Sequence, residues 1–427
     1  MTDRRPRKRS GTPQGGQFDA VARPESDLHL EPPEASWPVV TYEEHEWLPS
    51  YQLPRVSGRV MAASRGPYKA AVVRPIADIP IVDLPPEVSV DAGDAAVEIA
   101  RFDSGLGAEI APFAAVLLRS ESAASSKIEQ LTASVKSIAL AELGAKDGRN
   151  ATLIVSNAWA MQAAIELADR LDGDAILKMH DALLRADRPD MAGKWRTDQV
   201  WIGGSDYSPH LADFVPPHWE RVPAATDDLV AFMARADLPP LVQAAIAHAQ
   251  FETIHPFPDG NGRVGRALVH SLLRGKGLTR NVTVPVSAGL LTNTDSYYSA
   301  LTEYRAGNPA AIVERFTAAS FAAIGNGQTL VDDLRRVRTS WDDIIQARSG
   351  ATAWRLADLV IRQPIIDSPL AQRELGVSDH SANAAIESLE RAGVLKELSG
   401  KERNRKWEAS EVLTALDAFA TRSGRRG

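Results

Sequence analysis

The sequence predicts a mainly α-helical protein that ends in a small winged helix-turn-helix domain. From Asp91 to about residue 346, apolar residues recur at three- and four-residue spacing, and no strands alternate with the helices. After residue 350 the segments shorten into helix, helix, turn, helix and wing. With 427 residues, the chain is long enough for two or three domains, each with its own core.

Nine helices and one extended stretch are expected in the body of the chain. Most of the helical segments are rich in Ala and Leu, so propensity and periodicity agree. The extended stretch, residues 196–217, places Gly203 and Gly204 between two strand-like runs, which is typical of a β-hairpin. Proline-interrupted runs between residues 37 and 86 predict loops and short edge strands that wrap a neighbouring element. The expected helices span residues 91–103, 126–143, 156–171, 174–186, 226–236, 241–254, 263–277, 308–325 and 329–346.

Changes in composition divide the chain into four parts. A basic, Pro-rich tail over residues 1–34 is expected to be disordered, because few of its residues could pack into a core. An N-terminal region over residues 35–145 and a helical core over residues 146–345 follow. The winged helix-turn-helix occupies residues 350–420.

The overall composition is that of a globular protein, with 44% hydrophobic and 24% charged residues. The net charge of −7 argues against a protein coated in nucleic acid but allows a local basic patch. The absence of cysteine excludes thiol nucleophiles and thiolate metal sites, and it fits a cytoplasmic location. No segment approaches the roughly 20 apolar residues that a membrane span needs, so no membrane partner is expected. The oligomeric state stays open, a homodimer included.

One short segment, HPFPDGNGRVGR at residues 255–266, carries unusual chemistry. Gly260, Asn261 and Gly262 allow a tight loop in front of a helix, where unpaired amides and the helix dipole favour an anion. Arg263 and Arg266 follow in the first turn and can flank one phosphate chain. The alternative, a plain turn followed by two solvated arginines, leaves the combination of these residue types unexplained.

Two further side chains of this segment complete a set for transfer of a phosphate-linked group. Asp259 is a hard oxygen ligand that suits Mg²⁺, which typically binds one or two carboxylates together with phosphates and water. His255 can accept a proton from an attacking hydroxyl. The segment therefore predicts a base, a metal ligand and an anion site in one place.

The segment resembles the signature of the Fic family, H-x-F-x-(D/E)-G-N-G-R-x-x-R, at every defined position. The resemblance implies the helical Fic fold and transfer of AMP from ATP to a target hydroxyl. It implies that His255 is the general base and Asp259 the Mg²⁺ ligand. It gives residues 260–262 as the anion hole, Arg263 as the ligand of the α- and β-phosphates, and Arg266 as the ligand of the γ-phosphate. The kinase-like Doc branch has lysine in place of Gly262 and lacks the second arginine, so adenylylation is favoured over phosphorylation.

Two other segments extend the resemblance. Residues 193–217 resemble the family's flap, which lies beside the nucleotide and pairs with an extended target segment; Gly203 and Gly204 would belong to the nucleotide site. Without the signature, this stretch would read as a surface turn. Tyr297 and Tyr298 resemble an aromatic pair found after the motif in relatives, and they either line the adenine pocket or pack the core.

SSKIEQ, residues 125–130, has two interpretations. Ser126 and Glu129 have the spacing of a helix-capping box. The stretch also resembles the Fic inhibitory motif (S/T)-x-x-x-E-(G/N), with Ser125 and Glu129 in register and Gln130 where Gly or Asn is usual. That resemblance implies that Glu129 pairs with Arg266 in the place of the γ-phosphate and blocks productive ATP binding.

The sequence thus predicts a protein adenylyltransferase that uses ATP and Mg²⁺ on a Ser, Thr or Tyr hydroxyl, its own chain included. Removal of AMP by the same site stays open. So does a nucleotide-sensing regulator that binds DNA, or a protein, through the winged helix. The recognition helix is poor in positive charge, with Arg391 against Glu387 and Glu390, whereas the wing is basic. His180 and His248 are expected to be packed or hydrogen-bonded, because a zinc site needs more convergent ligands.

Overall fold

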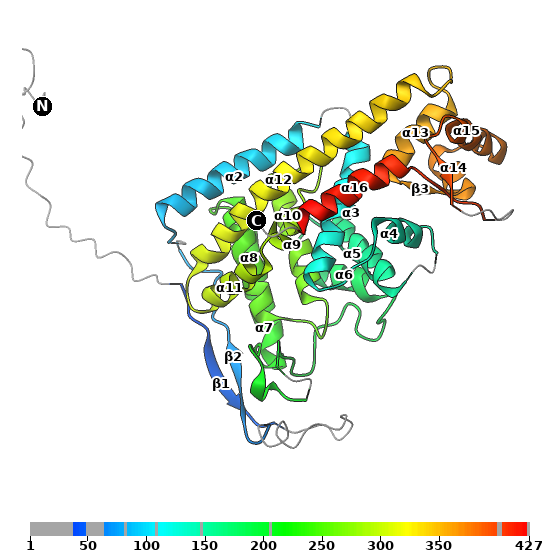
Figure 1. Cartoon of the computed structure of the whole chain (residues 1–427). Coiled ribbons are helices and arrows are strands. Elements are labelled where there is room, and N and C mark those ends of the chain that lie inside the picture. Colours follow the sequence, from blue (N-terminus) through cyan, green and yellow to red (C-terminus); the bar gives the residue numbers. More distant parts are fainter. Residues whose placement is uncertain are drawn as a thin grey trace, which may run out of the picture. The chain divides into compact units, whose positions relative to one another are not determined.

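The computed structural model describes residues 37–47, 64–80, 83–106, 110–145, 148–204, 207–398 and 404–424. The predicted tail, residues 1–34, lies outside this part, as do Lys401 and Arg403 of the wing. The described chain is mainly helical, as predicted (Figure 1). The elements are β1 Thr41–His45, β2 Tyr68–Val72, α2 Pro86–Ser104, α3 Ile110–Ile128, α4 Val135–Glu142, α5 Arg149–Glu166, α6 Gly173–Leu184, η2 Pro209–Leu211, η3 Trp219–Arg221, α7 Val222–Ala234, α8 Pro240–Ile254, α9 Asn261–Gly275, α10 Val286–Leu291, α11 Thr294–Arg305, α12 Pro309–Ser340, η4 Trp341–Asp343, α13 Thr352–Arg362, β3 Ile365–Ile366, α14 Ser368–Leu375, α15 Asp379–Arg391, β4 Lys396–Glu397, β5 Trp407–Glu408 and α16 Ser410–Ser423.

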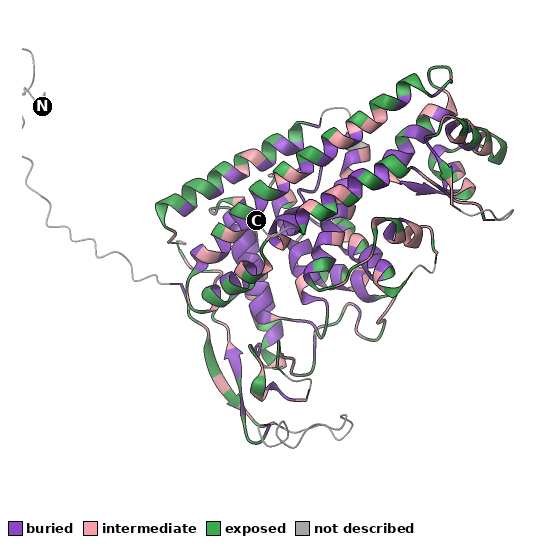
Figure 2. Cartoon of the chain, in the orientation of Figure 1, coloured by how far each residue is buried: buried purple, intermediate pink, exposed green. Residues whose placement is uncertain are grey.

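The two consecutive helices α8 and α9 lie at the centre of the helical body. Every residue of α8 from Leu241 to Ile254 is buried, so this helix is covered on all sides instead of presenting the single apolar face expected of an amphipathic helix (Figure 2). Its many alanines allow neighbouring helices to approach closely on every side. Helix α9 is buried almost throughout, including the two motif arginines. The two arginines of the motif therefore lie inside the protein.

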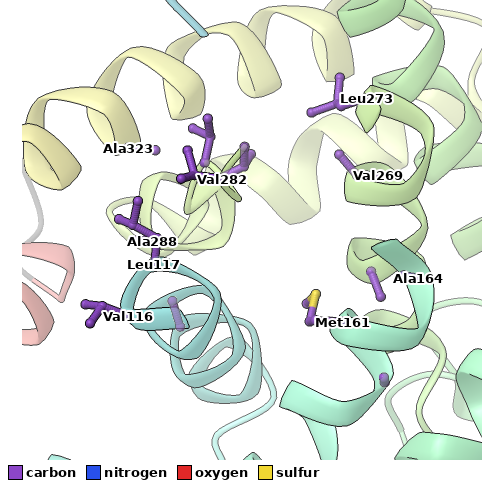
Figure 3. Packing of buried hydrophobic residues seen from close by; sticks show 14 of the residues in the cluster. Val116, Leu117, Met161, Ala164, Val269, Leu273, Val282, Ala288 and Ala323 are labelled. Carbon is purple, nitrogen blue, oxygen red and sulfur yellow. The ribbon is translucent and has the colours of Figure 1, made fainter. Parts of the chain in front are cut away.

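A hydrophobic core surrounds this central pair. Figure 3 shows side chains from α3, α5, α9, α10 and α12 that pack into one cluster, among them Leu117, Met161 and Leu273. Helix α3 contributes Val116 and Leu117 to the cluster and contacts α5, α9 and α10. The helix that precedes Glu129 is thus part of the core, and its C-terminal end is positioned by that packing.

Two expected helical boundaries differ from the structure. The predicted helix 126–143 is wrong: it overlaps only the end of α3, which spans Ile110–Ile128 and was otherwise not predicted, and α4 begins at Val135. The two helices predicted at 308–325 and 329–346 form one long helix, α12, which lies alongside α2 (Figure 1). Gly327 is tolerated inside α12 because the ring of Phe102 on α2 occupies the space of a side chain, and an added Cβ would lie 3.1 Å from that ring. Packing against a neighbour outweighs the low helix propensity of glycine here.

The N-terminal segment forms an antiparallel hairpin against the flap, as expected of strands that wrap a neighbour. β1 pairs with β2 from Thr41 opposite Val72 to His45 opposite Tyr68. The amide of Ala71 donates to the carbonyl of Val215 at 2.9 Å, which attaches β2 to the end of the flap. The hairpin therefore supports the flap from outside.

The C-terminal unit is a winged helix-turn-helix in which β3, β5 and β4 form an antiparallel three-stranded sheet in that order. A final helix, α16, was not predicted; it returns along α12 and contacts α3 and α4. At the end of α13, Arg119 on α3 donates to the carbonyl of Arg362 at 2.7 Å and to Oε1 of Gln363 at 3.0 Å. Among the described helices, none is both long and apolar enough to cross a membrane.

Candidate active site

The motif loop connects α8 to α9 through two left-handed residues. His255 ends α8 with φ 49°, and Gly260 precedes α9 with φ 82°. A Cβ on Gly260 would lie 2.8 Å from the side chain of Leu183, so both the backbone conformation and the space favour glycine. Histidine is among the residues enriched in the left-handed region, although it pays a strain energy there. That strain requires support from the surroundings.

Arg196, a buried residue that the sequence analysis did not single out, provides this support. Its Nε donates to the carbonyl of His255 at 2.9 Å, and Nη2 donates to the carbonyl of Pro217. Its own amide donates to the carbonyl of Pro256 at 3.0 Å. One guanidinium thus links the backbone of the catalytic loop to the end of the flap. The sequence could have indicated this role only through the position of Arg196 in the flap segment KWRTD.

Asn261 and His180 hold the loop from two further sides. Asn261 forms a reciprocal pair with the backbone of Phe257: Oδ1 accepts from the amide at 2.9 Å, and Nδ2 donates to the carbonyl at 2.8 Å. The ring of His180 stacks on Phe257 at 3.7 Å and contacts the carbonyl of Asp259 through Nε2 at 3.2 Å. Burial lowers the pKa of His180 to about 4, so this ring is neutral at neutral pH. The expectation that His180 is hydrogen-bonded is confirmed.

A cavity of about 420 Å³ lies at the loop and is lined by consecutive residues from Pro258 to Arg263, together with His255, Glu129 and Arg149. Within the described chain, no side chain caps the N-terminus of α9. The first amides of this helix therefore have no intrahelical or capping partner and can bind an anion. Burial, followed by the positive charges of Arg196 and Arg305, lowers the pKa of His255 to about 3. Its imidazole is therefore neutral at neutral pH and has a free lone pair.

Asp259 and Arg263 form an ion pair within one turn, with Nη2 3.2 Å from Oδ1. The arginine side chain is buried, whereas 52% of the Asp259 side chain is exposed. No group of three or more acidic or histidine side chains converges anywhere in the described ranges. The donor set at Asp259, a single carboxylate, fits an Mg²⁺ ion that completes its coordination with nucleotide phosphates and water.

Arg266 is held by the end of α3. Its Nε donates to Oγ of Ser125 at 2.9 Å, and its Nη2 donates to the carbonyl of Ser125 at 2.8 Å and to Oε1 of Glu129 at 2.8 Å. Only 2% of the arginine side chain is exposed, against 38% for Glu129. Burial alone would lower the pKa of Arg266, but nearby acidic groups, Glu129 first among them, outweigh it and raise the pKa. The arginine is fully charged and its partner is within reach of solvent.

The C-terminus of α3 explains how Glu129 reaches this position. The amide of Leu131 donates to the carbonyl of Ser126 at 3.0 Å, and that of Gln130 to the carbonyl of Lys127 at 2.9 Å, which is a Schellman motif. Gln130 has φ 60°, a left-handed conformation that glycine or asparagine adopts with less strain. The capping-box interpretation of Ser126 and Glu129 is wrong, because both stand at the end of a helix and not at its start.

Gly262 provides the space that Glu129 occupies. A Cβ at this position would lie 2.1 Å from Oε1 of Glu129, closer than any side chain could approach. This glycine is therefore required by the contact between α3 and α9, in addition to any role toward an anion.

The flap has fewer paired residues than the β-hairpin that the sequence predicts. In the described part of the segment, pairing is limited to one antiparallel bridge between Ile202 and Phe214. Gly203 and Gly204 both have φ 74°, and a Cβ on Gly203 would lie 2.0 Å from the carboxylate of Asp213. These glycines form a bend at the predicted position, but the connection between the paired residues Ile202 and Phe214 is longer than the tight turn of the predicted hairpin.

Tyr297 and Tyr298 differ in environment. Tyr297 is buried in the core, with its hydroxyl 2.7 Å from Nε2 of His248, so the prediction that His248 is hydrogen-bonded is confirmed. Tyr298 is half-exposed, and its hydroxyl lies 3.4 Å from the carbonyl of Ile128 at the end of α3. The pair therefore has one member in the core and one beside Glu129.

The surface of the helix-turn-helix has mixed charge. Arg391 on α15 is exposed, as is Glu387. Arg405 of the wing lies 2.6 Å from Glu397, which neutralises part of the basic wing. The described part of this surface has no strong excess of positive charge.

Comparison with known proteins agrees with this geometry. The Fic/DOC family model matches residues 170–273, and an HTH DNA-binding domain model matches residues 354–409. The chain is 32% identical over 134 residues to protein adenylyltransferase fic-1 of Caenorhabditis elegans, which covers 31% of this chain and 24% of that protein. It is 35% identical over 122 residues to a probable protein adenylyltransferase of Aquifex aeolicus, covering 26% of this chain and 36% of the relative.

The matches thus span about a quarter to a third of the length of these relatives. Among solved structures, a Fic family protein from Desulfovibrio desulfuricans aligns with a TM-score of 0.48 and 21% identity, over 77% of this chain and 97% of that one. Residues 170–273 of this chain thus resemble the Fic/DOC family, and residues 354–409 resemble a helix-turn-helix DNA-binding domain.

Proposed function

We propose that this protein is an ATP- and Mg²⁺-dependent protein adenylyltransferase that modifies a Ser, Thr or Tyr hydroxyl and is autoinhibited by Glu129. One observation carries the proposal: a neutral histidine, an exposed carboxylate and an uncapped helix N-terminus line one cavity, beside an arginine held by Glu129. The names of the relatives support the same activity.

In the proposed reaction, the target hydroxyl gives its proton to His255 while its oxygen attacks the α-phosphorus of ATP. The bond from the α-phosphorus to the bridging oxygen of the β-phosphate breaks, and pyrophosphate leaves. Arg263 and the amides of residues 260–262 stabilise the charge on the phosphates. Asp259 would hold Mg²⁺, which neutralises part of that charge when bound.

The pair of Glu129 and Arg266 is the proposed brake. Arg266 binds the γ-phosphate in this proposal, so Glu129 and ATP compete for one guanidinium. Because 38% of the Glu129 side chain is exposed, it can leave without opening the core. Because the guanidinium is buried but the carboxylate is exposed, the energy at stake is roughly 1.5–3 kcal/mol, the range of hydrogen bonds to charged groups.

Incubation with α-labelled ATP, Mg²⁺ and a cell lysate tests the proposal. We expect Glu129→Gly to raise protein labelling about 10²-fold over wild type, because the competitor of the γ-phosphate is gone. Glu314→Gln, an exposed glutamate on α12, serves as the matched control and should label like wild type. The double variant Glu129→Gly/His255→Ala should show no labelling.

Two outcomes would contradict the proposal. If Glu129→Gly binds ATP but labels no protein, the transferase assignment fails. If the wild type instead removes label from modified protein and Glu129→Gly does not, the site catalyses removal of AMP, with Glu129 orienting a water.

A second candidate function is DNA binding, favoured by the match of residues 354–409 to a DNA-binding family. We propose that α15 and the wing contact the duplex. A duplex mobility shift that weakens with salt and is unchanged by His255→Ala would support it. A shift that Arg391→Ala and Arg405→Ala leave unaltered would refute this surface. We also propose that the chain is divided into parts at residues 145 and 345. We further propose a cytoplasmic location, where ATP is available.

A further inference from the structure

A buried carboxylate that the proposed reaction does not use lies one turn before His255. Glu252 on α8 is 6% exposed, and its Oε2 lies 3.8 Å from Nδ1 of His255. Its Oε1 has no hydrogen-bond donor in the described structure, and Nδ1 of His255 has no acceptor there. Unpartnered buried polar atoms are rare, because each one costs the desolvation of a polar group. The carboxylate thus has one oxygen, Oε2, 3.8 Å from Nδ1 of His255 and a second, Oε1, with an unused acceptor site, while Nδ1 can be a donor.

His248 and Gly265 lie close to Glu252. Nδ1 of His248, one turn earlier, is also buried without a partner, whereas its Nε2 contacts Tyr297. A Cβ on Gly265 would lie 3.1 Å from both Oε1 of Glu252 and Nδ1 of His248. Glycine at 265, a position that the Fic signature leaves open, therefore avoids a close contact with these two polar groups next to the proposed active site.

We propose that Glu252 is a positioning residue for His255: its carboxylate accepts the Nδ1–H of the ring, which fixes the tautomer whose unprotonated Nε2 takes the proton of the target hydroxyl. This inference rests on the proposed function. Bases in nucleophilic active sites are commonly oriented by such a third group. A gap of 3.8 Å must close by about 1 Å, and catalytic hydrogen bonds are often long before substrate binds.

The charge balance of the step gives Glu252 a second effect. When Nε2 accepts the proton, the ring becomes an imidazolium, and the adjacent carboxylate stabilises it without taking the proton. The proton returns to solvent from Nε2 after AMP transfer. A hydrogen bond between the backbone of Glu252 and the ring of His255 also acts to raise the pKa of this histidine, so that backbone contact is the competing explanation for the tautomer.

Several charged groups determine when Glu252 is ionised. Burial raises its pKa to about 7; Arg266 on α9 and Arg305 on α11 lower the pKa, whereas Glu129 raises it. Tyr297 on α11 also faces this group. Loss of Glu129 therefore lowers the pKa of Glu252. In a Glu129→Gly background, the fraction of ionised Glu252, and with it kcat, is expected to rise with pH up to or below 7 and then level off.

The test uses the full chain with Glu129→Gly as parent. We expect Glu252→Gln, which keeps the shape and loses the charge, to lower kcat about 10- to 100-fold, with the KM for ATP within about twofold of the parent. The rise of kcat that the parent shows up to pH 7 should disappear. Glu121→Gln is the matched control: Glu121 is also buried and bound to a histidine, His270, at 2.7 Å, but it lies outside the cavity. It should leave the pH profile unchanged.

Histidine ¹⁵N shifts provide a readout that does not depend on activity. The parent should show His255 protonated on Nδ1, and Glu252→Gln should shift the ring toward a mixture of tautomers. If His255 is protonated on Nε2 in the parent, or keeps its tautomer and kcat in Glu252→Gln, the inference is wrong even where that variant folds poorly. If the parent transfers no AMP, the proposed function fails, while the tautomer still decides the role of Glu252.

Discussion

Two arginine–carboxylate pairs in the first turn of α9 differ in where the carboxylate comes from. Arg263 pairs with Asp259, four residues earlier in the motif loop, at 3.2 Å. Arg266 pairs with Glu129, which follows α3 and lies 137 residues away in the chain, at 2.8 Å. Both guanidinium groups are buried and both carboxylates are partly exposed.

The pair of Arg263 and Asp259 therefore belongs to a part of the site with fixed geometry. The geometry of the pair of Arg266 and Glu129 can change. The local pair is held by the loop, which Arg196, Asn261 and His180 fix from three sides. The distant pair depends on how α3 packs, and movement of one helix end is enough to break it. In the proposed function, such a site would keep its chemistry in place while its access to ATP changes.

Removal of the local carboxylate should have the largest effect. In the Glu129→Gly background, we expect Asp259→Asn to lower AMP transfer on the order of 10²-fold, because an amide is a poor ligand for Mg²⁺ but keeps the hydrogen bond to Arg263. Raising the Mg²⁺ concentration should restore part of the rate. Initial rates over an Mg²⁺ titration measure both effects.

Asp187 is the matched control for this change. It lines the same cavity and pairs with Arg149 at 2.9 Å. Asp187→Asn should retain most of the parental rate. Equal losses in the two variants, or Mg²⁺ requirements that do not differ, would contradict the assignment of Asp259 as the metal ligand.

Weakening the pair of Arg266 and Glu129 should raise AMP transfer. This rise should be smaller than the loss expected for Asp259→Asn. Ser125→Ala leaves the Nε–H of Arg266 without its side-chain acceptor, which costs roughly 1–2 kcal/mol in the resting state. With Glu129 present, transfer should rise by about fivefold to thirtyfold, and labelling rates measure it. Ser126→Ala is the control, since Ser126 is equally buried but contacts Asn157. A rise that persists in the Glu129→Gly background would show that Ser125 acts by another route.

Local sequence predicted those parts of the fold whose conformation depends on neighbouring residues. The turn at Gly203-Gly204 and most helices could be recognised because periodicity and glycine act over a few positions. The break after Ile128 could not, since residues 129–134 contain neither glycine nor proline; it depends on a Schellman motif and on packing of α3. Helix α16 was missed because the wing precedes it without a break in composition.

The sequence by itself determined the proposed chemistry of this protein: a histidine, an aspartate, glycines and two arginines at fixed spacing predict a base, a metal ligand and an anion site. Only the tertiary structure decided which groups meet. Glu129 reaches Arg266, Arg196 holds His255, and Glu252 lies next to the same ring with its Oε1 unpartnered among the described residues. The reason is physical, because spacing along one helix or loop is fixed by backbone geometry, whereas contacts between distant elements follow from how the core packs.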